Sequence, residues 1–334
     1  LLRKQSKQIP TSGESNLNTY FKLITMVGSR CGSHQGNTVA HIFQRARNGF
    51  VVFYNVKDSL FFITSFCIIA RQHGVKVLAL CLMYNHVHIL LDTDDKESIR
   101  LFIKELMSYF CKSYNRRYGL SGVLFDSYGV SLKKGDKAIR TALAYVNNNP
   151  VEDHICGKAE EWRWNFLAYA FSDHPFSEKL SRRVASTKMR KNLKEIEGCC
   201  SRGSYLRYPQ LHRMFDGLSP EEKNQLIDFI VITYNVIEYD RLSSYYGSPE
   251  KMLLAINSNT GSEYDIREER HHNPDTSYGQ MMNYVVRYDY VTRAKDVILL
   301  PIKEKNVLMR ILVRDTMADE WQALKFLGMD LPSR

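Results

Sequence analysis

The stretch CLMYNHVHILL, from Cys81 to Leu91, decides the fold expected for this chain. Residues 75–83 are almost continuously apolar, which is typical of a central strand with both faces buried. Tyr84 and Asn85 interrupt this pattern, and residues 86–91 predict a second strand. The stretch therefore predicts two consecutive strands in the interior of a sheet.

Two histidines of this stretch, His86 and His88, are two residues apart on the second strand. Alternate residues of a strand point to the same face, so both imidazoles can hold one metal ion while Val87 packs into the core. A pair of surface histidines on an exposed strand would show the same spacing. The apolar residues on either side, 80–82 and 89–91, favour a buried strand and hence a metal site.

The neighbouring segments alternate between strand and helix patterns. We predict strands at 37–43, 49–54, 75–83, 86–91 and 123–132, and helices at 58–73, 96–117 and 137–148. Asp58 is the expected N-cap of the first helix, and Pro150 is expected to end the third, because the residue before proline disfavours helical backbone. This order predicts an α+β, ferredoxin-like domain: an antiparallel sheet with helices on one face.

A second candidate site lies at the end of the third predicted helix. Tyr145 and Asn149 are four residues apart and therefore share a helix face. A tyrosine hydroxyl, with a pKa of about 10, is a poor nucleophile at neutral pH. A divalent metal on His86 and His88 could polarise a phosphate for attack by Tyr145, with the Asn149 amide oxygen as a third ligand. An ordinary half-buried tyrosine before a polar helical turn would look the same.

The 334 residues carry a formal net charge of +10, which suits a polyanionic partner. We expect four parts: a flexible lead-in at 1–36, a catalytic domain at 37–176, a basic linker at 177–213 and a mainly helical C-terminal domain at 214–334. Two amphipathic segments at 303–328 fit a helix-turn-helix, although any helical hairpin would look alike.

Two groups of basic residues are candidates for DNA contact. The first, around the start of the tyrosine helix, could equally be a solvated helix start; it consists of Lys133, Lys134, Lys137 and Arg140. The second, within residues 179–194, could equally be a solvated linker; its candidates are Arg182, Arg183, Lys188, Arg190 and Lys191.

Together these motifs resemble one family. Residues 81–91, followed by Tyr145 and the Asn148-Asn149-Pro150-Val151 run, resemble the REP-associated, single-tyrosine HUH transposases, relatives of the transposases of small insertion sequences. Residues 162–166, Trp-Arg-Trp-Asn-Phe, are similar to the closing segment of that family. The resemblance covers about residues 37–176.

The resemblance implies a function and a set of roles. His86, His88 and Asn149 would hold Mg²⁺ or Mn²⁺, and Tyr145 would be the nucleophile. The substrate would be single-stranded DNA with hairpin-bearing ends, cleaved and rejoined through a 5′-phosphotyrosine intermediate that leaves a free 3′-hydroxyl. The chain departs from the family at Tyr84, where proline is usual, so the entry to the metal strand is expected to differ.

Alternatives to an active transposase remain open at this point. A domesticated transposase that binds DNA repeats without cutting them, or a rolling-circle replication initiator, would carry many of the same features. The resemblance allows a homodimer, and leaves open whether Tyr145 serves the metal site of its own subunit or a partner's. Seven scattered cysteines without a CxxC pair, and no long apolar stretch, predict a cytoplasmic protein without a membrane span.

Overall fold

The computed structural model describes residues 38–258 and 274–330, so the lead-in predicted for 1–36 lies outside the described residues. Within them, four strands form an antiparallel sheet in the order β2-β3-β1-β4. These strands are β1 (Thr38–Arg45), β2 (Val77–Leu82), β3 (His86–Leu91) and β4 (Gly129–Lys134). With one helix between β1 and β2 and another between β3 and β4, this topology confirms the ferredoxin-like prediction.

Helices α2 (Val56–His73) and α3 (Lys96–Tyr118) cover one face of the sheet. The Asn55 side chain caps α2 by accepting from the N–H groups of Lys57 and Asp58. The prediction that Asp58 is the cap was therefore wrong by three residues. Asp58 is instead buried inside the first turn, where its carboxylate accepts hydrogen bonds from two tyrosine hydroxyls.

Helix α4 (Asp136–Glu152) lies on the other face of the sheet, which corrects the expectation of helices on one face. Its buried side chains Leu143 and Val146 share a cluster with Val39 of β1 and Leu90 of β3. A helical pattern shows that one side is apolar but not which face of a sheet will receive it. The two faces are thus covered by different helices.

Two predicted boundaries also change. Helix α4 continues past Pro150 to Glu152. A proline in the last turn of a helix removes only the hydrogen bond that its missing N–H would donate. The carbonyl of Asn149 still accepts a hydrogen bond from the N–H of Asp153. Residues 50–54 are extended and largely buried but form no strand in the described sheet, and a short 3₁₀ turn, η1 (Arg47–Gly49), precedes them. The N–H groups of Val52 and Phe53 both donate to the carbonyl of Tyr84.

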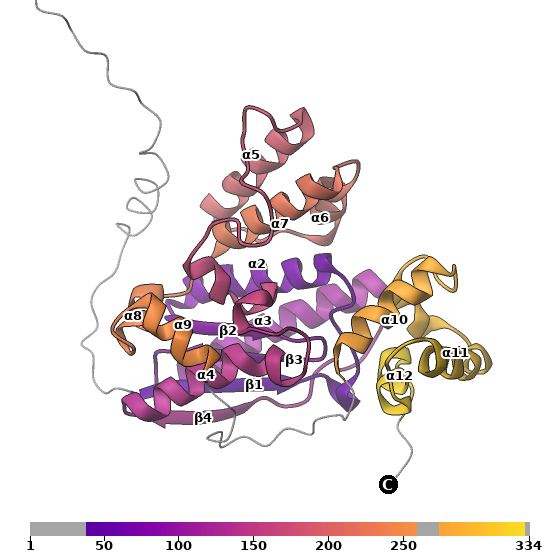
Figure 1. Cartoon of the computed structure of the whole chain (residues 1–334), viewed down its shortest axis with the longest axis horizontal. Helices are drawn as coiled ribbons and strands as arrows, with labels where there is room; N and C mark the ends of the chain where they lie inside the picture. The colour runs from indigo at the N-terminus through magenta and orange to yellow at the C-terminus, as the bar shows by residue number, and fades with distance from the viewer. Residues whose placement is uncertain (1–37, 259–273, 331–334) are drawn as a thin grey trace, which may run out of the picture. The chain divides into compact units, whose positions relative to one another are not determined.

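The segment 177–213, expected to be a basic linker, contains two packed helices. Met189, Leu193 and Leu211 from this segment are fully buried in the cluster that also contains α2. Figure 1 shows α5, α6 and α7 stacked beyond α2, on the side away from α4. The helices are α5 (Thr187–Ser201), α6 (Tyr208–Phe215) and α7 (Pro220–Tyr234).

The remaining described elements follow in two groups. Helices α8 (Tyr239–Ser244) and α9 (Pro249–Asn257) join the α4 side of the core. Helices α10 (Thr276–Arg287), α11 (Ile302–Asp315) and α12 (Glu320–Leu327) surround a third cluster that includes Val51 and Tyr54. The predicted helical hairpin at 303–328 corresponds to α11 and α12. Short 3₁₀ turns complete the list: η2 (Ala159–Glu161), η3 (Arg163–Asn165), η4 (Leu167–Ala170) and η5 (Ala294–Leu299).

All described residues fall in one compact unit that begins at Thr38. None of the helices it contains, over 38–258 and 274–330, combines the length and apolarity that a membrane crossing requires.

Candidate functional site

Three histidines meet on the sheet face that α4 covers. In the antiparallel β1–β3 pair, Phe43 lies opposite His88 and Arg45 opposite His86. Directly opposed residues share a face, and so do residues two apart along a strand. His41, two residues before Phe43, therefore joins His86 and His88 on this face. All three imidazoles are buried, with at most 4% of each residue exposed.

His86 is fixed from both sides by amide oxygens. Its Nδ1 lies 2.7 Å from Oδ1 of Asn85, and its Nε2 lies 2.8 Å from Oδ1 of Asn149 on α4. Asn85 is itself held by a 3.1 Å hydrogen bond from its Nδ2 to the carbonyl of Gly49. Asn85 thus orients the imidazole so that Nε2 faces the end of α4.

Tyr145 lies against the same imidazoles, in the same chain. Its ring centroid is 5.4 Å from that of His88 with the planes at 87°, and 5.6 Å from that of His41. The His86 and His88 rings are 5.1 Å apart. The structure therefore brings together the four predicted site residues, Tyr145, His86, His88 and Asn149, within one protomer.

The three asparagines that end α4 have different contacts. Asn149 reaches His86, whereas Nδ2 of Asn148 donates to the carbonyl of Ile256 on α9 at 2.6 Å. Nδ2 of Asn147 donates to the carbonyl of Leu143 one turn earlier, and the carbonyl of Asn147 accepts from Asn165. These bonds fix the end of α4, and with it the position of the Asn149 amide.

The donor set suits a divalent metal. With Nδ1 of His86 donating to Asn85, Nε2 carries a lone pair that faces the Asn149 oxygen 2.8 Å away. Two ligand atoms at right angles around an ion, each about 2.1 Å from it, are about 3 Å apart. Among the described residues no group of three or more His, Cys, Asp or Glu side chains could hold a metal; the Asn149 amide oxygen lies beside the His86 nitrogen as a further donor.

Two site residues were missed by the sequence reasoning. His41 falls in the predicted strand 37–43, but its place beside His88 depends on the β1–β3 register, which the sequence does not show. In the sequence, Asn85 indicates only a break between two strands. Its signal was its position directly before His86, where a short amide side chain can reach the neighbouring imidazole.

Tyr84, the departure from the family pattern, has a packing role. Its ring is 5.7 Å from the rings of Trp162 and of Tyr278 on α10. The Trp162 indole N–H donates to the carbonyl of Leu82 at the end of β2. Burial, with a smaller contribution from Asp275, raises the pKa of Tyr84 to about 12. Tyr84 is thus a neutral phenol that links the turn before β3 to α10.

The two groups of basic residues lie in different places. Lys133, Lys134, Lys137 and Arg140 lie on β4 and α4, the helix that carries Tyr145. Arg182, Arg183, Lys188, Arg190 and Lys191 lie in or just before α5, which packs against α7 on the side of the sheet that α2 covers. Arg182 is also paired with Glu197. Only the first group therefore lies on an element, α4, that also carries residues of the site.

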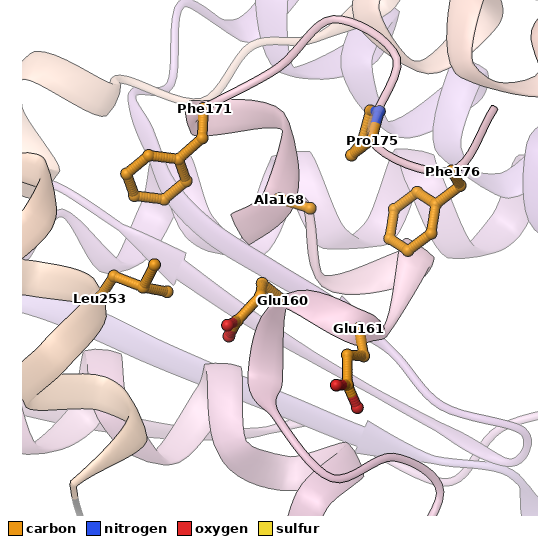
Figure 2. A pocket seen from close by; sticks show the side chains of 7 residues that line it. All are labelled: Glu160, Glu161, Ala168, Phe171, Pro175, Phe176 and Leu253. Carbon is orange, nitrogen blue, oxygen red and sulfur yellow. The ribbon is translucent and has the colours of Figure 1, made fainter. Parts of the chain in front are cut away.

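A cavity of about 500 Å³ lies outside the histidine site. It is lined by Glu160, Glu161, Ala168, Phe171, Pro175, Phe176 and Leu253, so none of the four predicted site residues contributes to it. Figure 2 shows the two carboxylates and two phenyl rings around this hollow. Carboxylates repel phosphate, so this cavity does not suit a DNA backbone.

Comparison with known proteins agrees with the sequence resemblance. Residues 36–149 match the family model described as "Transposase IS200 like". This segment holds the four strands of the sheet and the part of α4 that carries Tyr145. The match covers about a third of the chain and ends at Asn149. The resemblance inferred from residues 81–91 and from Tyr145 is thereby confirmed.

Other comparisons add little. A solved structure of a REP-associated tyrosine transposase bound to a REP hairpin is similar at 13% sequence identity and a TM-score of 0.34, covering 48% of this chain and 94% of that one. No curated protein sequence matches this chain.

Proposed function

We propose that this chain is a transposase that cuts and rejoins single-stranded DNA through a covalent bond to Tyr145. The observation that carries the proposal is the placement of the Tyr145 ring 5.4 Å from the His88 ring, on the sheet face where His86 meets Asn149. The match of residues 36–149 to an IS200-like transposase family supports the same reaction class.

His86, His88 and Asn149 would hold Mg²⁺ or Mn²⁺ through two nitrogens and one amide oxygen. When bound, the metal would polarise the scissile phosphate and offset the negative charge that develops there. Asn85 holds the His86 imidazole with Nε2 towards Asn149, and the hydrogen bonds of Asn147 and Asn148 hold the end of α4. The proposed ligand Asn149 and the proposed nucleophile Tyr145 are therefore held in place by the same helix.

In the proposed step, the Tyr145 oxygen attacks phosphorus and the bond from phosphorus to the 3′ oxygen breaks. The phenolic hydrogen is transferred, in net terms, to the departing 3′ oxygen, which becomes a free 3′-hydroxyl. The products are a 5′-phosphotyrosine and a 3′-hydroxyl, so the ester energy is retained for rejoining. Lys137 and Arg140, exposed on the first turns of α4, would contact the DNA backbone.

An adduct assay tests the proposal. Wild-type protein with Mn²⁺ and a labelled, hairpin-bearing single-stranded oligonucleotide should give a covalent protein–DNA band, and Tyr145→Phe should give none. Tyr114→Phe is the matched control, because Tyr114 is equally buried but lies on α3, where its hydroxyl donates to the carbonyl of Val52 at 2.7 Å. An adduct with Tyr145→Phe would show that the nucleophile is misassigned.

The same assay addresses the alternative functions. A domesticated repeat-binding protein would bind the oligonucleotide with or without His86→Ala and Tyr145→Phe, and would form no adduct at any Mn²⁺ concentration. A rolling-circle initiator would form the adduct on a plasmid-origin strand in preference to the hairpin-bearing strand.

A further inference from the structure

We propose that His41 is a positioning residue for the metal site, which holds His88 in the tautomer whose Nε2 binds the ion. This inference rests on the proposed function, since it concerns the same site. It assigns a role to a residue outside the set formed by His86, His88, Asn149 and Tyr145.

The contact between the two imidazoles is direct. Nε2 of His41 lies 3.1 Å from Nδ1 of His88, and the two ring centroids are 5.2 Å apart. His41 is 1% exposed and His88 is fully buried, so water has little access to compete for this bond. The β1–β3 register, with His41 opposite Leu90 and Phe43 opposite His88, fixes this diagonal approach across the strand pair.

The direction of this hydrogen bond decides whether His88 can be a ligand. Between two neutral imidazoles one nitrogen donates and the other accepts. If Nδ1–H of His88 donates to Nε2 of His41, then Nε2 of His88 carries the lone pair that a metal requires. In the reverse direction Nε2 of His88 carries the hydrogen and cannot bind. We assign the first direction to the functional site.

His41 also contacts the nucleophile. Its ring centroid is 5.6 Å from that of Tyr145, with the planes at 66°, an edge-on contact. One side chain of β1 therefore touches both a ligand on β3 and the nucleophile on α4. A substitution of His41 is expected to weaken metal binding directly, through its contact with His88. Its effect on the rate of the reaction is expected to follow from that loss of metal.

Metal binding by the whole chain tests the role. Titration with Mn²⁺ alone, followed by the electron paramagnetic resonance signal of the free ion, should show affinity about 10- to 100-fold weaker for His41→Leu than for the wild type. His41→Gln offers an amide oxygen to the Nδ1–H of His88, and should retain affinity to within about threefold. His174→Leu removes a distant histidine next to Asp173, and should change nothing.

The tautomer itself can be measured without any variant. Long-range ¹H–¹⁵N correlation spectra of the metal-free wild type should show the hydrogen of His88 on Nδ1. A hydrogen on Nε2 would overturn the proposal even if His41→Leu did not fold. So would a folded His41→Leu with wild-type Mn²⁺ affinity, or a His41→Gln as weak as His41→Leu.

The outcomes separate this inference from the proposed function. If wild type and His41→Leu bind Mn²⁺ equally and both form the Tyr145 adduct, only the role of His41 is lost. If the wild type binds no Mn²⁺, the metal site fails and the positioning role fails with it.

Discussion

The two faces of the sheet are built from the same strands but carry different chemistry. On one face Ile42, Val87 and Ile89 pack into the large apolar cluster beneath α2 and α3. On the other, His41, His86 and His88 meet Tyr145 and Asn149 beneath α4. Adjacent residues of β3 alternate between the two, so one six-residue strand supplies both core and site. Stability and chemistry are therefore separable by single substitutions.

The sharpest test of this division compares neighbours on β3. His88→Ala should lower the rate of adduct formation about 10³-fold or more, because it removes several kcal/mol of metal-based stabilisation at about 1.4 kcal/mol per tenfold. Ile89→Ala, one residue later and facing α2 and α3, should instead cost about 2–5 kcal/mol of folding free energy. Adduct rates and urea denaturation measured on both variants check the two effects.

The comparison breaks down if the effects are exchanged. Full activity in His88→Ala, or loss of Mn²⁺ binding in a folded Ile89→Ala, would show that the faces do not divide the two tasks.

The pH dependence of folding stability tests the packing of the sheet face that α2 and α3 cover, through the buried carboxyl group of Asp58. Burial raises the pKa of Asp58 to about 6, in spite of a hydrogen bond from Tyr118, the nearby charge of Lys295 and a hydrogen bond from Tyr208. The folded state therefore holds this proton more tightly than the unfolded state, and the stability gained from it at low pH is lost as pH rises from about 4 to 6.

Urea denaturation of the wild type and of Asp58→Asn at several pH values isolates this contribution. The stability of the wild type relative to the variant should fall as pH rises across that window. A difference that is flat, or that rises with pH, would contradict the assignment. Activity at a fixed pH is expected to change only in proportion to the folded fraction.

The smallest expected effect concerns the basic residues on either side of the sheet. Lys137→Ala and Arg140→Ala should each reduce the dependence of log Kd on log salt by about 0.7 for a single-stranded oligonucleotide, because each removes one phosphate contact. Arg182→Ala should leave this slope unchanged, since Arg182 pairs with Glu197 on the side away from α4. Equal slopes for all three variants and the wild type would show that Lys137 and Arg140 of α4 do not contact the DNA.

Local patterns predicted the parts of the molecule that depend on neighbours in sequence. Strand β3 has the predicted bounds, 86–91, and α3 begins at the predicted Lys96. The pairing of Tyr145 with Asn149 followed from helical spacing. These features are set by the alternation of side chains in strands and by one-turn contacts in helices, both of which a sequence displays.

Features that depend on long-range placement were missed. The sequence showed an apolar stripe on α4 but not the sheet face that receives it, and it could not place His41 beside β3. Residues 49–54 have the composition of a strand, yet Val52 and Phe53 share the Tyr84 carbonyl instead of joining the sheet. In α5 a run of basic residues is typical of a linker, but Met189 and Leu193 are spaced one helical turn apart and are buried in a packed helix.

The central claim is that Tyr145 acts as the nucleophile, and mass spectrometry of the covalent protein–DNA adduct tests it most directly. After wild-type protein reacts with Mn²⁺ and a hairpin-bearing strand, nuclease and protease digestion should leave a nucleotide joined through its 5′-phosphate to the peptide that contains Tyr145. The chain has 20 tyrosines, so the position is informative. A nucleotide on any other tyrosine, or one joined through its 3′-phosphate, would contradict the account.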